Sequence, residues 1–316
     1  MFHLYTIRDT QENCIMTDQI TKKMKKKNVD WKITFDQTQS LRTLFEVVGN
    51  ILTRVSVSLK FDNKKNAHFL CIDSVDPRHV CMIQARLVCE KASRQIQNES
   101  FCVDSNILNN CLKNIPNHYS VDLEKHTDND NIHIFAYETL SNSHSTTYII
   151  PTLMSDSESM HLQDMDYKYT IEIDLSTLRQ IVKMSQQLRA DTIDLQVSEP
   201  AEDNPNRSCI TISAQGEATI KHNFYSNMVH EETQNTNVMR AMVDTTSPDG
   251  SEEENMVVKY EERYSAQYLN FFLKSMERQI ITMKLSADQP LIIHYPLGAD
   301  KSYICFVLAP KAEDDE

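Results

Sequence analysis

The chain has 316 residues, 40% of them hydrophobic and 24% charged, an ordinary globular composition that is enough for about two domains. No run approaches the roughly 18 apolar residues of a membrane span, and no apolar core of a secretion signal is present near the N-terminus, so we expect no membrane partner. The net charge of −13 argues against broad contact with nucleic acid, although much of the acid is concentrated at 156–158, 252–254 and 313–316.

Residues 1–30 are polar and end in the run Lys22-Lys23-Met24-Lys25-Lys26-Lys27, without a sustained apolar period. We therefore predict a flexible basic extension. The lysine run fits a nuclear-import or DNA-binding patch and fits a solvated basic arm equally well, so both interpretations stay open.

A first domain is predicted at 31–153, where the pattern becomes regular. Apolar residues at helical spacing predict a helix in its first part, namely Leu41, Leu44, Phe45, Val48 and Ile51. Strand-like alternation follows at 68–73 and 80–87, then a short helix at 105–115 and strands at 120–123, 132–137 and 146–153.

Residues 154–167 are rich in Ser, Asp and Glu, and they predict an exposed connecting loop between two domains. The second domain is predicted at 168–316. It contains predicted helices at 174–189 and 265–278, and its polar stretch 231–255 predicts a long inserted loop.

The second domain repeats the order of the first. Residues 41–48 (LRTLFEVV) resemble 175–182 (LSTLRQIV) at an offset of 134 residues (175 − 41). Residues 106–113 (NILNNCLK) resemble 267–274 (QYLNFFLK) at an offset of 161 residues (269 − 108). Two ordered matches predict a tandem duplication, with the inserted loop accounting for the larger offset. Chance similarity between amphipathic helices is the alternative.

The predicted helices carry an apolar stripe for packing on a sheet, and their other faces are basic or neutral, with Glu46 and Glu277 as acidic members. Lys and Arg on such faces attract DNA phosphates without reading the base sequence, whereas an ordinary solvated helix surface is the alternative. No cluster of exposed aromatic residues predicts base stacking, which disfavours single-stranded DNA. The candidate phosphate contacts are Arg42, Lys113, Arg179, Lys183, Lys274 and Arg278.

Several segments together resemble one known family. They are SVDPRHV at 74–80, SAQGE at 213–217, YLNFFLK at 268–274, LSADQPLIIHY at 285–295 and FVLAPKAEDDE at 306–316. Their order over about residues 33–316 resembles that of the proliferating cell nuclear antigen family, the eukaryotic DNA sliding clamps. The resemblance implies an α+β DNA clamp fold with two similar domains per chain. It also implies a homotrimeric ring, with helices lining the hole and β-sheets forming the outer wall.

The same resemblance implies the partners and the sites. The partners would be double-stranded DNA, DNA polymerase, other replication and repair proteins with short motifs, and a clamp loader, in the nucleus or in a viral replication factory. No cofactor, metal or catalytic residue is implied. The partner-peptide groove would comprise Val75, His79, Val80, Met82, Met160, Leu162, Pro290, Val307, Ala309 and Pro310. The trimer interface would pair strand 146–153 with strand 217–225 of the next subunit, through Tyr148, Ile150, Ala218 and Ile220.

The sequence also departs from the family pattern. The N-terminal extension and the long loop at 231–255 are unusual, and Val307 stands where an aromatic ring is common. Gly49, Asn110 and Gln267 stand where Lys or Arg is frequent. These departures predict a divergent clamp, from a virus or a distant eukaryote.

Two other classes of function remain as alternatives. A monomeric polymerase accessory factor would bind DNA on one basic face without encircling it. A DNA-processing enzyme has little support, because the four glycines form no phosphate-binding loop and no carboxylates stand at a metal-binding spacing. The eight cysteines form no zinc-type spacing, so we interpret them as reduced thiols of an intracellular protein.

Overall fold

The computed structural model describes residues 29–36, 38–93, 96, 98–138, 145–154, 165–200, 208–226, 229–231, 236–241, 256–274, 280–298 and 301–311. The predicted helices are confirmed within this part of the chain, with small changes at their ends. They are α2 (Thr38–Gly49), α3 (Ser105–Lys113), α4 (Leu175–Gln187) and α5 (Ala266–Leu273). The last helix was predicted to continue to 278, but 275–279 lie outside the described residues.

Capping side chains and apolar stripes explain where these helices form. The Asp104 carboxylate accepts hydrogen bonds from the backbone N–H groups of Asn106 and Ile107, and Asp174 accepts one from Thr177 N–H. Such caps satisfy N–H groups that the first helical turn leaves without a partner. Each helix then buries one stripe against the sheets, as α4 does with Leu175, Leu178, Ile181, Val182 and Ser185.

The strands form three sheets. One has the order β5-β1-β7-β8-β9, and another has the order β13-β12-β11-β16. The largest has the order β14-β15-β10-β17-β18-β19-β4-β3-β2-β6, so it contains strands of both predicted domains. The first sheet comprises β5 (Lys91–Ala92), β1 (Val29–Phe35), β7 (Tyr119–His126), β8 (Asn131–Glu138) and β9 (Ser145–Pro151). The second comprises β13 (Thr219–Ser226), β12 (Ser208–Gln215), β11 (Thr192–Pro200) and β16 (Met256–Ser265).

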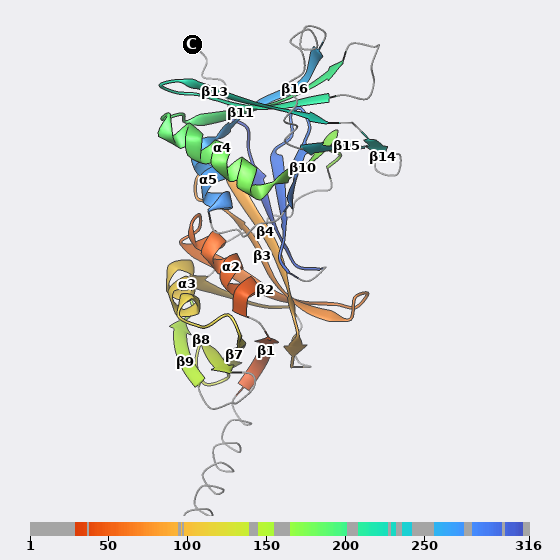
Figure 1. Cartoon of the computed structure of the whole chain (residues 1–316). Helices are drawn as coiled ribbons and strands as arrows, with labels where there is room; N and C mark the ends of the chain where they lie inside the picture. Colours follow the sequence, from red (N-terminus) through yellow and green to blue (C-terminus); the bar gives the residue numbers. More distant parts are fainter. Residues whose placement is uncertain are drawn as a thin grey trace, which may run out of the picture.

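The ten-stranded sheet joins the two halves of the chain through β4 and β19, which pair antiparallel. Its strands are β14 (Val229–Glu231), β15 (Thr236–Ala241), β10 (Tyr169–Asp174), β17 (Ile280–Leu285), β18 (Leu291–Pro296), β19 (Tyr303–Leu308), β4 (Cys81–Cys89), β3 (Ala67–Val75), β2 (Arg54–Asp62) and β6 (Glu99–Asp104). The four described helices lie together on one side of the molecule (Figure 1). None of them is long and apolar enough to cross a membrane.

The strand pairings repeat between the two halves. In the first half β2 pairs with β3 and β6, β3 with β4, β7 with β1 and β8, and β8 with β9. In the second half β11 pairs with β12 and β16, β12 with β13, β17 with β10 and β18, and β18 with β19. The order of elements and the pattern of pairs are therefore those of a duplicated unit.

The structure corrects one of the two sequence offsets. Helices α2 and α4 begin 137 residues apart (175 − 38), and this shift also superimposes the buried Leu41 and Leu44 on Leu178 and Ile181. The sequence match at 134 was wrong by nearly one helical turn, because an apolar stripe resembles itself after three or four residues. The offset of 161 for α3 and α5 is confirmed, since it superimposes Ser105 on Ala266 and Leu108 on Leu269.

The structure also differs from the prediction at two boundaries. Strand β1 begins at Val29, inside the range 1–30 that was predicted to be a flexible extension. Strand β15 lies within 231–255, where a loop was predicted, and it pairs parallel with β10. Met239 of this strand is fully buried, so the segment docks through backbone pairing with β10 and through burial of this side chain.

Candidate nucleic-acid face, partner groove and open strand edges

The helices carry the candidate DNA-binding residues. Within the four described helices the cations are Arg42, Lys113, Arg179 and Lys183, and the anion is Glu46. The other exposed positions are largely neutral and polar, including Asn106, Asn110, Gln180, Gln186, Gln187 and Gln267. In a chain with a net charge of −13, the described helices therefore carry more cations than anions.

The predicted phosphate contacts are not equally available. Lys113, Lys183 and Lys274 are exposed, and Arg42 donates a hydrogen bond to the side-chain oxygen of Asn117 at 3.0 Å. Arg179 donates from Nε and Nη2 to the carbonyl oxygen of Leu273, at 3.0 and 2.8 Å. Arg179 thus ties α4 to the C-terminal end of α5, which leaves fewer of its donors for phosphate. Arg278 lies outside the described residues.

On the ten-stranded sheet, Val75, Met82 and Val307 of the predicted groove form one row. The register places Val75 opposite Met82, Met82 opposite Val307, and Val307 opposite Ile292, so the row crosses four strands. Alternate residues of the same strands, such as Ile83 and Phe306, belong to the main core instead. Because side chains alternate along a strand, the row lies on the face turned away from the helices.

Sequence reasoning missed several members of this apolar cluster. Tyr167, Ile292 and Cys305 are buried in it, and Met165 and Tyr303 pack against it. The Tyr167 hydroxyl donates to the carbonyl oxygen of Pro290 at 3.1 Å, which fixes the end of the connecting loop over the row. Met160 and Leu162, the two loop residues predicted to cover the groove, lie outside the described residues.

A tight turn at 76–81 forms the rim beside this row. The buried Asp76 carboxylate accepts hydrogen bonds from the backbone N–H groups of Arg78, Val80 and Cys81, at 3.1, 2.8 and 2.6 Å. It also accepts one from the Tyr268 hydroxyl of α5, at 2.6 Å. These bonds hold the pKa of Asp76 below its usual range despite the opposing effect of burial. The carboxylate therefore stays ionised and fixes the turn.

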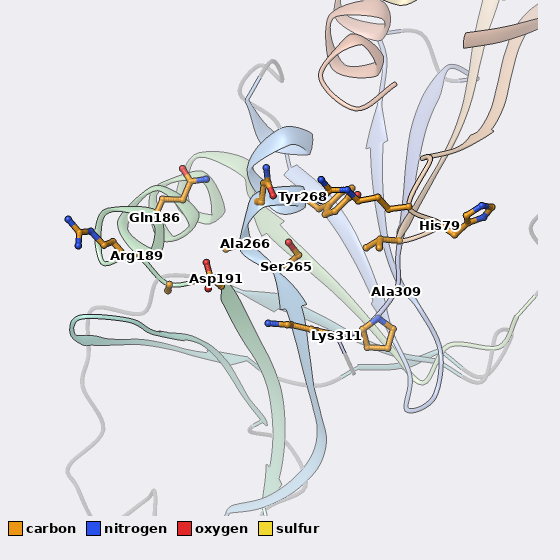
Figure 2. Close-up of a pocket in the computed structure, with 14 residues that line it drawn as sticks. His79, Gln186, Arg189, Asp191, Ser265, Ala266, Tyr268, Ala309 and Lys311 are labelled. Carbon is orange, nitrogen blue, oxygen red and sulfur yellow. The ribbon is translucent and has the colours of Figure 1, made fainter. Parts of the chain in front are cut away.

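The turn presents His79 and joins the groove to a cleft. His79 has a φ of 58°, a left-handed conformation that the four bonds to Asp76 help to maintain. Val80 lies beside it and accepts a hydrogen bond from Ala309 N–H at 2.9 Å. The cleft has a volume of about 750 Å³ and is lined in part by His79, Val80, Ala309 and Pro310, all predicted groove residues. Figure 2 shows it between the end of α4, the start of α5 and the C-terminal segment.

Six described strands end the three sheets, and two of them lie at opposite ends of the molecule (Figure 1). They are β9, which carries Tyr148 and Ile150, and β13, which carries Ile220. Ala218 is exposed in the turn before β13. In that turn the backbone of Gly216 packs so closely on α4 that a Cβ would lie 2.0 Å from the carbonyl oxygen of Leu188. The turn therefore requires glycine.

The described residues include no group of three His, Cys, Asp or Glu side chains that could hold a metal ion. The described cysteines are free thiols, and all but Cys111 are buried. Burial raises the pKa of Cys305 to about 12. A thiol with so high a pKa is a poor nucleophile at neutral pH, which fits a packing role.

Comparison with known proteins supports the fold. No protein-family model matches the chain. The chain is similar to the crystal structure of PCNA (proliferating cell nuclear antigen) from Thermococcus kodakaraensis, with a TM-score of 0.68, 15% identity, and coverage of 89% of this chain and 100% of the other. The corresponding values for a PCNA2–PCNA3 complex from Sulfolobus tokodaii are 0.65, 15%, 89% and 100%. The chain therefore has the α+β DNA clamp fold that was predicted.

Proposed function

We propose that this chain is one subunit of a homotrimeric DNA sliding clamp. The ring would encircle double-stranded DNA and recruit DNA polymerase and other replication or repair proteins through short motifs. It would act as a scaffold rather than as an enzyme, and a clamp loader would open it onto DNA. The observation that carries this proposal is that the chain already contains one copy of the strand junction that would close a ring.

The junction within the chain is the β4·β19 pair, and the duplication identifies the equivalent strands. In the first half, neighbouring strands place Ile33 of β1 opposite Leu123 of β7, Leu123 opposite Ile134 of β8, and Ile134 opposite Tyr148 of β9. In the second half, the matching row runs from Ile171 of β10 through Met283 of β17 and Ile293 of β18 to Phe306 of β19. Tyr148 of β9 is therefore the counterpart of Phe306 of β19. Strand β9 is the last strand of its sheet, whereas β19 has β4 as a further neighbour.

Strand β13 is in turn the counterpart of β4. Asp104 and Ser265 occupy the N-cap positions of α3 and α5, so they are equivalent. Asp104 pairs with Arg54 of β2, and Ser265 pairs with Thr192 of β11. Counting from these pairs matches Ile83 of β4 with Ile220 of β13, and Cys81 with Ala218. A copy of the β4·β19 junction between two chains would therefore pair β9 of one chain with β13 of the next.

This reasoning sets a register for the subunit contact. Phe306 lies opposite Ile83, and Leu308 lies opposite Cys81. The equivalent contact would place Tyr148 opposite Ile220, and Ile150 opposite Ala218. These are the residues that the family resemblance implies, reached here by strand pairing. Tyr148 and Ile220 are only partly buried, as expected for side chains that await a partner.

In such a ring the four helices of each chain would face the hole. Lys113, Lys183 and Lys274 would contact phosphates there, with Arg42 and Arg179 contributing their remaining donors. The neutral Asn and Gln positions between them would keep these contacts few, which suits movement along DNA. The apolar row and its rim would bind partner peptides on the outer side. The divergent features of the sequence favour a viral or eukaryotic source, and hence a nuclear or viral replication site.

The decisive experiment measures mass and topology together. Light scattering at micromolar concentration should give the mass of a trimer. After loading, the protein should stay on closed circular DNA and leave the same DNA once it is cut, because a ring slides off free ends. The double variant Lys183→Glu/Lys274→Glu should remain trimeric while its retention becomes weaker and less dependent on salt. A monomer that binds linear and circular DNA equally would favour the alternative, an accessory factor with one basic face.

A further inference from the structure

We propose that the cleft beside the groove binds a carboxylate side chain of the partner, so that recruitment favours peptides with Asp or Glu next to their apolar anchors. This inference rests on the proposed function, because it assigns a second contact to the peptide that the groove would hold. The carboxylate would lie between Arg78 and Lys311.

The cleft and the groove are continuous. The two segments that form the groove rim, 75–80 and 307–311, also supply Arg78, His79, Val80, Ala309, Pro310 and Lys311 to the cleft lining. The remaining lining comes from the end of α4 and the start of α5, including Tyr268. A peptide anchored on the apolar row therefore has the cleft within reach of its next few residues, each of which spans up to about 3.5 Å.

The cleft holds two cations that lack a carboxylate partner among the described residues. Arg78 and Lys311 form no ion pair with a described carboxylate, whereas Arg189 at the other rim pairs with Glu217 at 2.9 Å. Several cations of the sheets are also paired, as Lys32 is with Asp122 and Arg86 with Asp62. Two cations without an ion pair among the described residues thus face one cleft on an acidic protein.

Both cations start from fixed backbone. Arg78 N–H donates to the Asp76 carboxylate at 3.1 Å, and Lys311 N–H donates to the carbonyl oxygen of Arg263 at 2.7 Å. Only side-chain freedom is therefore lost when they bind an anion, which lowers the entropic cost of recognition.

The remaining charge in the cleft sets where the anion can lie. Asp191 is the acidic residue of the lining, and it lies on the α4 side together with Arg189 (Figure 2). Lys311 extends from the C-terminal segment toward the α4 side, and His79 lies at the opposite end of the cleft (Figure 2). A carboxylate is repelled by Asp191 and attracted by Lys311 and Arg78, so the preferred position lies between the two cations and away from Asp191.

The test uses matched peptides on the intact protein. One fluorescent peptide carries an aliphatic and an aromatic anchor with two Asp residues beside them, and its control carries Asn in their place. A third peptide carries Lys there. Because exposed ion pairs contribute modestly, we expect the Asp peptide to bind about 5-fold more tightly than the Asn peptide at low salt. The difference should shrink as salt is added.

Charge reversal identifies the cations. Arg78→Glu/Lys311→Glu should remove the preference for Asp and create one for Lys, with an unchanged trimer mass. The matched control is Lys64→Glu/Lys65→Glu, which changes the net charge equally at exposed positions between β2 and β3. That control should keep the preference for Asp.

The outcomes separate this inference from the proposed function. Equal binding of the Asp, Asn and Lys peptides would overturn the acidic preference while the groove stands. Loss of the preference in both charge-reversal variants would also overturn it, because a general field rather than the cleft would be responsible. Failure of every peptide to bind a trimeric protein would overturn the groove itself, and the inference with it.

Discussion

The β4·β19 junction and the open strands β9 and β13 share one geometry but differ in their side chains. In the closed junction Phe306 and Ile83 are fully buried, and the outer row beside them is Met82, Val307 and Ile292. At the open edges the inner counterparts are Tyr148 and Ile220, both partly buried. The outer counterparts are Thr219, Ile149 and His133.

These side chains suit the closed junction and the open strands to different contacts. The closed junction is apolar on both faces, so it joins the halves permanently and leaves an apolar row for a partner. The open strands keep an inner apolar pair, whereas two of their three outer residues, Thr219 and His133, are polar. A contact of that kind is weaker and can be opened. We therefore expect one partner groove per chain, at the closed junction alone.

Removing the central ring of the closed junction should have the largest effect. Phe306 is fully buried and stacks on Phe272 with ring centroids 4.2 Å apart. Phe306→Ala should lower the free energy of unfolding by about 3–5 kcal/mol, because it removes a buried ring and leaves a cavity. Urea unfolding at fixed subunit concentration measures this. Phe61→Ala, at a position 37% exposed, is the control and should cost far less. A small loss for Phe306→Ala would mean that the halves are joined elsewhere.

Placing a charge in the open junction should break the ring and leave the fold intact. Tyr148→Asp would put a carboxylate opposite Ile220 with no partner, so we expect monomers by light scattering at micromolar concentration. Ile150 is a poorer choice, because it is 1% exposed and a charge there would damage the sheet.

The control for this charge uses the same strand. Thr147 is exposed on the other face of β9, and the proposed register places it opposite Lys221 of the next subunit. Thr147→Asp should therefore stay trimeric. A trimeric Tyr148→Asp variant would show that β9 does not form the contact.

Sequence patterns located the features that depend on local spacing. The four helices and the α3/α5 offset follow from apolar periodicity, which neighbouring residues determine. The predicted α2/α4 offset was wrong by nearly one helical turn, because apolar periodicity looks alike after a shift of three or four residues. The row of Val75, Met82, Val307 and Ile292 joins residues up to 232 positions apart (307 − 75), and only the strand register reveals it. The family resemblance identified three of the four, and Ile292 carried no signal of its own.

Other parts of the site depended on contacts that no local pattern encodes. Arg179 was predicted to face phosphate because it shares a helix face with Lys183, yet its guanidinium donates to Leu273. Strand β15 lies in a stretch whose composition is typical of a loop, and it docks because β10 offers an edge. Tyr167 was assigned to an exposed loop and is buried instead. In each case tertiary partners override the local pattern.

Acid should weaken the sheet that ends at β9. His133 is buried, its ring stacks on His126 at 4.0 Å, and it lies opposite Ile149 of β9. Burial first, and then His126, lower the pKa of His133 below 6.5, against the smaller effects of Glu124 and Asp128. Neutral His133 therefore contributes stability above about pH 6.5, and this contribution is lost as the pH falls through the lowered pKa.

Light scattering from pH 7.5 down to 5 tests this expectation. The trimer should dissociate as the free energy of unfolding, followed by circular dichroism in urea, falls over the same pH range. His133→Phe cannot titrate and resembles the apolar Ile292 of the closed junction, so its trimer should persist to lower pH. Dissociation of both proteins at the same pH would remove His133 as the cause.

The smallest effect concerns the turns that lead into the two junction strands. The turn before β13 is held by backbone bonds, including one from Glu217 N–H to the carbonyl oxygen of Leu188 at 2.8 Å. The turn before β4 is held by the Asp76 side chain and the Tyr268 hydroxyl. Burial, followed by the bond to Asp76, raises the pKa of Tyr268 to about 12, so this hydroxyl keeps its proton across the physiological range. The hydrogen bond between the Tyr268 hydroxyl and Asp76, called the latch below, thus lies at the closed junction beside the predicted groove.

Tyr268→Phe removes the latch with little change in shape. We expect partner-peptide affinity to fall by about 3- to 10-fold, because Asp76 loses a charge-assisted hydrogen bond and the turn carrying His79 becomes less fixed. Tyr264→Phe is the matched control, since it also removes one buried hydroxyl bond, the 2.7 Å contact with Tyr260, away from the turn. Both variants should lose similar thermal stability and remain trimeric. If both lose the same peptide affinity, the hydroxyl of Tyr268 acts through general stability. If only Tyr268→Phe loses it, the latch positions the groove of the closed junction.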